Sequence, residues 1–232
     1  MKSFLTQLKW QFILLQKNHI ISISLAVTFI YGLLLFFLKD IGNLDVLLVS
    51  IILNDPSVIG FFFLGLAIYT EIKQQVLPAI FTSPLNIHTF LLSKTLAISI
   101  VGLVCSLGLV FSVKGFDFDL LSFSIGAMAI CVMATFLGLF MLTYANEFLK
   151  FAMLSIPVFL AFFNLPLLQY LGIIDMGWAK YLFPIQGSLD LIDNAISGTE
   201  IHPYISYTTI IVSLPFLYWL AFNRFVKKIV SP

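Results

Sequence analysis

Six apolar segments, separated by short polar stretches, leave little room in this sequence for any other kind of domain. A helix needs about 20 apolar residues to cross the hydrocarbon core of a bilayer, so each segment is close to the length of one span. Only 10% of the 232 residues are charged. We therefore predict an all-α polytopic membrane protein, with one transmembrane domain over residues 1–232. Its six transmembrane helices are expected at residues 20–38, 56–71, 95–113, 120–144, 148–170 and 204–223.

Residues 1–17 have the pattern of a helix that lies in the membrane interface, with one apolar stripe and polar residues elsewhere. No A-x-A-like cleavage site closes the apolar run that follows, so an uncleaved start is expected. The alternative is a plain cytosolic extension of the first span, because Trp10 and Leu14 blur the stripe. The stripe consists of Phe4, Leu5, Leu8, Phe12 and Leu15.

The basic residues predict the orientation, since lysine and arginine concentrate in cytoplasmic loops. With the N-terminus inside, nine of the twelve basic residues are cytoplasmic, and both termini are expected there. The net charge of +1 offers no basic field for nucleic acid, so no nucleic-acid partner is expected. The nine are Lys2, Lys9, Lys17, Lys73, Lys94, Lys150, Arg224, Lys227 and Lys228.

Two regions are not simple spans. Asn54-Asp55-Pro56 reads as a helix start, with Asp55 as a cap near the outer surface and proline at the first helical position. Residues 46–53 then dip into the outer leaflet or form the upper half of one long broken span. Residues 171–203 are too apolar for a free loop and too interrupted for a span. We predict an extracellular cap of short helices there, which either gates an exit path or packs inertly.

The sequence lacks the motifs that several kinds of binding and catalysis require. The sequence has no G-x-x-x-x-G-K-[ST] loop for ATP and no G-x-S-x-G nucleophile elbow. His19, His88 and His202 are far apart and suggest no metal set. Proton-coupled transport usually needs buried carboxylates or histidines within the spans, and we expect none there, which argues against a secondary transporter. Cys105 and Cys131 read as packing residues. The chain is therefore predicted not to be an enzyme and to hold no cofactor.

The stretch between the second and third spans carries the most specific pattern. It begins EIKQQVLPAIF at Glu71, with Ile72, Val76 and Ile80 on one helical face. Residues 82–85 then turn the chain at a proline, and a lysine precedes the third span. This pattern predicts a short cytosolic helix over residues 72–86, kinked or split at Leu77 by the following proline.

The pattern of an acidic residue, a polar helix, Ser-Pro-Leu and a lysine resembles the permease subunits of ATP-binding-cassette type-2 exporters. The Asp55-Pro56 start, Gly60 and the Phe-rich second span look like the fluoroquinolone-export branch. The resemblance implies a coupling helix at 72–86, a bacterial inner-membrane location, a second permease copy, and a separate ATPase subunit that binds ATP and magnesium. The alternative is an ordinary loop between two spans. Residues implied to contact the ATPase are Glu71, Lys73, Gln74, Gln75, Ser83, Pro84, Leu85 and Asn86.

In that family the substrate path follows a dimer axis lined by the second and fifth spans. The apolar spans suggest a lipophilic or amphipathic cargo, such as a drug or a lipid. Phenylalanine in a span is more often a packing residue, which is the alternative here. A non-transporting docking or assembly protein of the membrane is the competing function. The implied path residues are Phe61, Phe62, Phe63, Phe162, Phe163 and Asn164.

Overall fold

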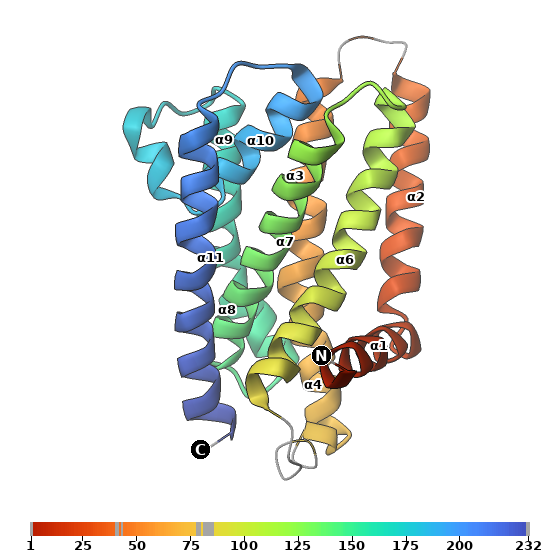
Figure 1. Ribbon diagram of the computed structural model, residues 1–232, viewed down its shortest axis with the longest axis vertical. Helices are drawn as coiled ribbons and strands as arrows, with labels where there is room; N and C mark the ends of the chain where they lie inside the picture. Colours follow the sequence, from red (N-terminus) through yellow and green to blue (C-terminus); the bar gives the residue numbers. More distant parts are fainter. Residues whose placement is uncertain (1, 40–41, 43, 78–79, 81–85, 231–232) are drawn as a thin grey trace.

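The computed structural model describes residues 2–39, 42, 44–77, 80 and 86–230, and the regular structure within them is helical (Figure 1). Two short helices, η1 and η2, are π-helical turns inside longer helical runs. A third π-helical turn, η4, ends the described chain, and η3 is a 3-10 helix. The elements are α1 (Lys2–Lys17), α2 (Ile20–Leu38), α3 (Asp45–Val58), η1 (Ile59–Phe63), α4 (Leu64–Lys73), α6 (Ile87–Lys114), α7 (Leu120–Leu142), α8 (Phe148–Phe159), η2 (Leu160–Asn164), α9 (Leu165–Tyr170), η3 (Gly177–Leu182), α10 (Gln186–Ser197), α11 (Pro203–Phe225) and η4 (Val226–Val230).

Within the described residues, six helical runs are long and apolar enough to cross a membrane. They run side by side in one bundle, and they confirm the predicted all-α membrane protein with six spans (Figure 1). We call the end of the bundle that carries α1 the α1 end, and the opposite end the α10 end. The runs are Ile20–Leu38, Asp45–Lys73, Ile87–Lys114, Leu120–Leu142, Phe148–Tyr170 and Pro203–Ile229.

The second span begins earlier than predicted, and Asp55 does not cap a helix. α3 starts at Asp45 and continues through Asp55 and Pro56 to Val58. The side-chain amide of Asn54 donates to the backbone oxygen of Ser50 at 3.1 Å, a bond back along the same helix. The predicted helix start is therefore wrong, and residues 46–53 are the upper half of one long span.

A π-helical turn follows the proline in two spans. η1 begins three residues after Pro56, and η2 begins three residues after Pro157. Proline has no N–H to donate, and its ring crowds the carbonyl four residues earlier. A wider turn is one way for a helix to absorb such a disturbance. Both spans therefore continue past their proline, which is why the sequence signal at Pro56 was misleading.

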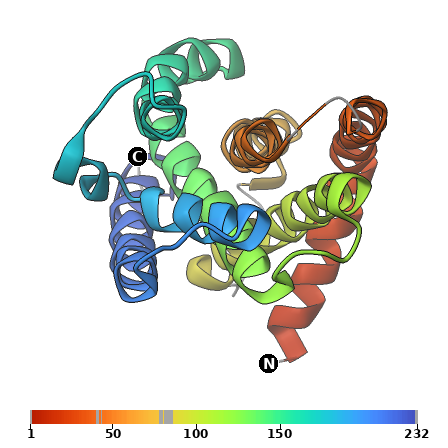
Figure 2. The same cartoon turned by 90° about the horizontal axis from the view of Figure 1, so that it is seen from above.

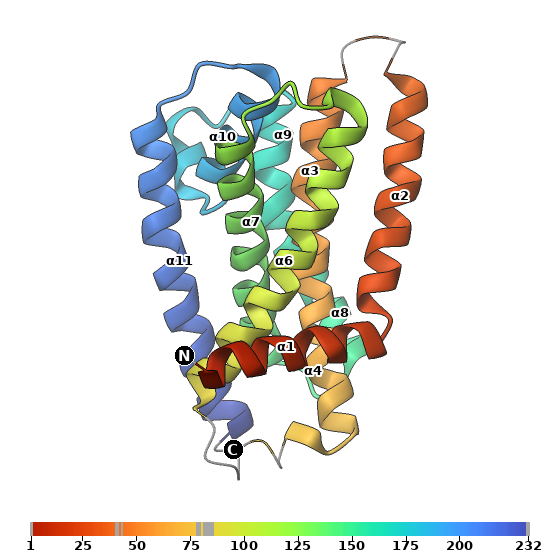
Figure 3. The same cartoon turned by 45° about the vertical axis from the view of Figure 1, so that its right-hand side comes forward.

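α1 runs across the α1 end of the bundle instead of continuing the direction of α2 (Figure 3). His19, between the two helices, has a φ of 59°, in the left-handed region. α1 packs against α6 and α2, where Gln11 and Leu15 are buried, while Trp10 on the stripe's margin is exposed. The alternative of a plain extension of the first span is therefore wrong.

α7 is the most buried span and packs against α6, α10, α11, α3 and η1 (Figure 2). Glycine permits close approaches between helices here, one between α7 and η1 and one between α10 and α11. A Cβ atom at Gly138 of α7 would lie 2.5 Å from the backbone oxygen of Phe61, and one at Gly187 of α10 would lie 2.4 Å from that of Ser206 on α11. Because real Cβ atoms do not approach so closely, these glycines let η1 and α10 sit directly against their neighbours.

α10 forms part of the bundle and not only a cover over it. It lies over α7 at the α10 end and also contacts α11 and α3 (Figure 2). Its apolar side chains Leu189, Leu191 and Ile192 are buried. The stretch 171–203 therefore contains short helices, η3 and α10, and the second of them is packed among the spans.

Candidate functional site

Glu71 and Lys94 form a buried ion pair near the α1 end. The Lys94 ammonium donates to Glu71 Oε1, and the side chains of Lys94 and Glu71 are 2% and 3% exposed. Glu71 lies on α4 and Lys94 on α6, so the pair joins the second span to the third. Either charge alone would be strongly disfavoured in such a site, because a buried ion loses its hydration. The pair therefore holds the end of α4 against α6.

α4 ends two residues beyond Glu71, and the chain then changes direction. α4 ends at Lys73, and Gln75 has a φ of 56°, in the left-handed region. Lys73, Gln74 and Gln75 are exposed, whereas Leu77, in the short helical segment that follows, is buried. No helix therefore runs unbroken from residue 72. The proline predicted a break at Leu77, but the break lies earlier, at Gln74 and Gln75.

The residues implied to contact an ATPase fall into three groups. Glu71 is buried and its charge is used inside the chain. Lys73, Gln74 and Gln75 are exposed, as is Asn86, whose Oδ1 accepts from the backbone N–H of His88 at 2.9 Å and so caps α6. Ser83, Pro84 and Leu85 lie outside the described residues, as does Pro78.

An aromatic cluster surrounds the two π-helical turns of the second and fifth spans. Phe61, in η1, stacks on Phe151 with ring centroids 6.0 Å apart and meets Phe159 edge to face at 5.6 Å. Phe159 in turn stacks on Phe163, in η2, at 4.9 Å. Aromatic pairs in these geometries contribute about 0.5–1.5 kcal/mol beyond the area they bury. The cluster thus links the second span to the fifth.

Of the implied path residues, some are buried in this aromatic cluster and the others are partly exposed. Phe61 and Phe163 are 0% and 1% exposed, so they are packing residues in the single chain. Phe62 also packs on Phe61 and Phe159, but it remains partly exposed. The other implied path residues are also partly exposed, namely Phe63, Phe162 and Asn164.

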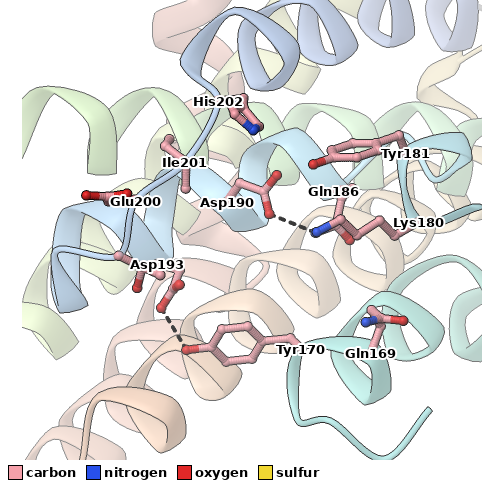
Figure 4. Close-up of a pocket in the computed structure, with 11 residues that line it drawn as sticks. Gln169, Tyr170, Lys180, Tyr181, Gln186, Asp190, Asp193, Glu200, Ile201 and His202 are labelled. Atoms are coloured by element: carbon pink, nitrogen blue, oxygen red, sulfur yellow. Dashed lines mark hydrogen bonds between the residues drawn. The ribbon is translucent and has the colours of Figure 1, made fainter. Parts of the chain in front are cut away.

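A polar pocket of about 380 Å³ lies at the α10 end, between the end of α9, η3, α10 and residues 199–202 (Figure 4). The Tyr170 hydroxyl donates to Asp193 Oδ1 at 2.8 Å, and the Ser197 hydroxyl donates to the same oxygen at 3.0 Å. The Gln186 amide donates to Asp190 Oδ1 at 2.8 Å. Burial raises the pKa of Asp190, while the bond from Gln186 and the charge of Lys180 act in the opposite direction. The pocket thus carries the carboxylates of Asp190 and Asp193, each of which accepts a hydrogen bond from within the chain.

A family model matches residues 3–232 and describes the fluoroquinolones export permease protein family. The chain belongs to this family. Two relatives are the fluoroquinolones export permease proteins of Mycobacterium tuberculosis strains CDC 1551 / Oshkosh and ATCC 25618 / H37Rv. Each is 24% identical to this chain over 160 residues, which cover 66% of this chain and 65% of the relative. The chain is therefore a multi-pass membrane protein of an export permease family, as the motif over residues 71–94 had indicated.

Sequence reasoning missed two features of this chain. It placed both Glu71 and Lys94 in the loop pattern but did not pair them, although opposite charges at the facing ends of consecutive spans were a usable signal. It also missed the polar pocket, because Tyr170, Asp190 and Asp193 meet only after α9 and α10 have packed. No spacing in the sequence indicates that meeting.

Proposed function

We propose that this chain is the membrane-spanning permease subunit of an ATP-binding-cassette exporter, powered by a separate ATPase subunit. Two copies, or this chain and a related one, would enclose a translocation path for a lipophilic or amphipathic substrate. Membership of an export permease family supports this function, and the relatives are named for fluoroquinolones. In this proposal the chain lies in a bacterial inner membrane with both termini, and thus the α1 end, in the cytoplasm.

The coupling role rests on one observation: a buried ion pair lies directly before an exposed polar turn. The buried Glu71–Lys94 pair binds α4 to α6, and the exposed polar residues Lys73, Gln74 and Gln75 follow directly. A partner that pushes on this turn acts on the second and third spans together. That is the input which an ATPase, closing around ATP, would need to bias the bundle toward an outward-open state.

The aromatic cluster supplies the connection from that input to the fifth span. Phe61 and Phe159 join the second and fifth spans at their π-helical turns, which are frequent at functional sites. In a dimeric path, the partly exposed Phe62, Phe63, Phe162 and Asn164 are the lining candidates, with Phe61 and Phe163 behind them as support.

The test is ATP hydrolysis by the permease co-purified in nanodiscs with the ATPase encoded by a neighbouring gene. We expect hydrolysis to depend on this chain and to fall by about fivefold or more in Lys73→Glu/Gln74→Ala, because losing important interface contacts commonly costs above 1 kcal/mol. Lys150→Glu is the matched control, since Lys150 is also exposed and also lies near the α1 end, at the start of α8. It should leave hydrolysis unchanged.

Two results would reject the proposal. If no ATPase co-purifies and the chain is instead recovered with a membrane assembly complex, the docking-protein function takes its place. If hydrolysis depends on the chain but Lys73→Glu/Gln74→Ala and Lys150→Glu behave alike, the coupling turn is assigned to the wrong segment.

A further inference from the structure

A cleft of about 780 Å³ lies at the side of the bundle, between α2 and α3. It arises because α2 packs mainly on α6 and α1, leaving its other side free toward α3 (Figures 1 and 3). Most of its lining is apolar, and in the described part of the chain its one charged residue is Asp55. The lining includes Val27, Tyr31, Ile51, Asn54, Val58 and Leu171.

Asp55 lies deep within a span. It is ten residues along the helix from Asp45, the first residue of α3, which corresponds to roughly 15 Å at the rise of an α-helix. Its Oδ2 atom is buried and has no hydrogen-bond partner among the described residues. An ionisable group at membrane depth is disfavoured and usually marks a function.

The other two carboxylates of the second span have basic partners. Asp45 Oδ1 lies 2.7 Å from the Lys114 ammonium, and Glu71 is paired with Lys94. Asp55 has no ion pair within the described residues. The span therefore contains one acidic group whose counter-charge the described residues do not supply.

Two polar neighbours of Asp55 in the cleft, Asn54 and Ser50, are already engaged with the backbone, and the third, Tyr31, makes no hydrogen bond to Asp55 Oδ2. The Asn54 amide donates to the Ser50 backbone oxygen at 3.1 Å, and the Ser50 hydroxyl donates to the Val46 backbone oxygen at 2.7 Å. Within the described residues no donor is bonded to Asp55 Oδ2, so a ligand in the cleft can supply one.

We propose that this cleft binds amphipathic compounds that carry a protonated amine. The ammonium group donates to the Asp55 carboxylate, and the apolar body packs between α2 and α3. The arrangement fits a cation on charge complementarity, because an ammonium supplies the missing partner of a buried carboxylate. The inference rests on the proposed function in treating the bound molecule as transported cargo.

The test is equilibrium binding to the full chain in nanodiscs of uncharged phosphatidylcholine, with empty nanodiscs subtracted. The probe is mono-dansylated 1,8-diaminooctane, which has one free amine, and its comparison is the same molecule N-acetylated. We expect the amine to bind about tenfold or more tightly than the acetylated probe, since a hydrogen bond to a charged group is worth about 1.5–3 kcal/mol. Asp55→Asn should abolish that preference, and Val58→Trp, which fills the cleft, should weaken both probes.

The matched control is Asp117→Asn, which removes one negative charge from an exposed loop position between α6 and α7. It should retain the preference for the amine. Equal binding of the two probes by the wild type, or an unchanged preference in Asp55→Asn, would overturn the proposal. So would an Asp55→Asn variant that changes the oligomeric state and not the preference, because the cleft would then be assigned to a second copy of the chain.

The binding assay contains no ATPase, so its outcome is separable from the proposed function. An amine preference that depends on Asp55 supports the cleft even when no ATPase is activated. Chain-dependent ATP hydrolysis without such a preference leaves the export function in place and rejects the cleft. Lys73→Glu/Gln74→Ala should lower hydrolysis by about fivefold or more while it keeps the amine preference.

Discussion

Glu71 and Asp55 lie on the same long span, yet the chain treats their carboxylates in opposite ways. Glu71, near the α1 end, is buried together with Lys94 of α6. Asp55, sixteen residues earlier, faces an apolar cleft and has no ion pair among the described residues. The difference indicates that the first acid belongs to the framework of the bundle, whereas the second is available to something that binds.

Removing the basic member of the paired site should have the largest effect. Lys94→Met leaves Glu71 buried without a counter-charge, which costs about 3–5 kcal/mol of unfolding free energy when a buried pair is broken. Denaturant titration of the purified protein in detergent measures the loss. Lys150→Met, at an exposed position, is the control and should change little. A loss below 1 kcal/mol in Lys94→Met would show that the pair does not hold the framework.

The paired site should tolerate removal of both charges far better than of one. In Glu71→Met/Lys94→Met no uncompensated charge is left, and replacing a buried pair by apolar residues is often neutral or stabilising by about 1–4 kcal/mol. We expect the double variant to recover most of the stability lost in Lys94→Met under the same titration. If the two single losses simply added, the residues would not act as a pair.

Asp55 should respond in the opposite direction from Glu71. Asp55→Asn removes a charge that has no ion-pair partner in the described chain, so we expect no loss of stability, or a gain of about 1 kcal/mol. Glu71→Gln, the equivalent change at the paired site, should be clearly destabilising. Thermal unfolding of the two variants side by side decides the comparison. The contrast between the two acids would be wrong if Asp55→Asn were as destabilising as Glu71→Gln.

Asp190, in the polar pocket, accepts a hydrogen bond from Gln186 but has no ion pair among the described residues, so its substitution should change stability least. Burial raises its pKa in the folded state, so folding favours the protonated carboxyl. The unfolding free energy should therefore rise as pH falls from neutral through the folded pKa, and level off below the unfolded value of about 3.9. Asp190→Asn should lack this contribution. The difference between the two pH profiles of thermal stability is the measurement, and parallel profiles would contradict the expectation.

The number of spans could be read from the sequence because it depends on local properties. A helix in a bilayer satisfies its own backbone hydrogen bonds, so the length of an apolar run is nearly sufficient to predict a span. The same holds for the helix over residues 2–17, whose polar and apolar residues alternate with helical period. The boundaries were poorest at Pro56, where a local signal for a helix start was overridden by a π-helical turn.

Which residues meet was decided by the tertiary structure alone. Glu71 and Lys94 are 23 positions apart and pair because α4 and α6 pack together, and Tyr170, at the end of α9, reaches Asp193 of α10 across the polar pocket. Asp55 became distinctive only once the helices had packed, because no described residue forms an ion pair with it. The six spans and the family membership could be predicted from the sequence, since both follow from hydrophobicity and local pattern. The packing of the helices decided which charges are satisfied, because that depends on the faces that distant segments turn toward each other.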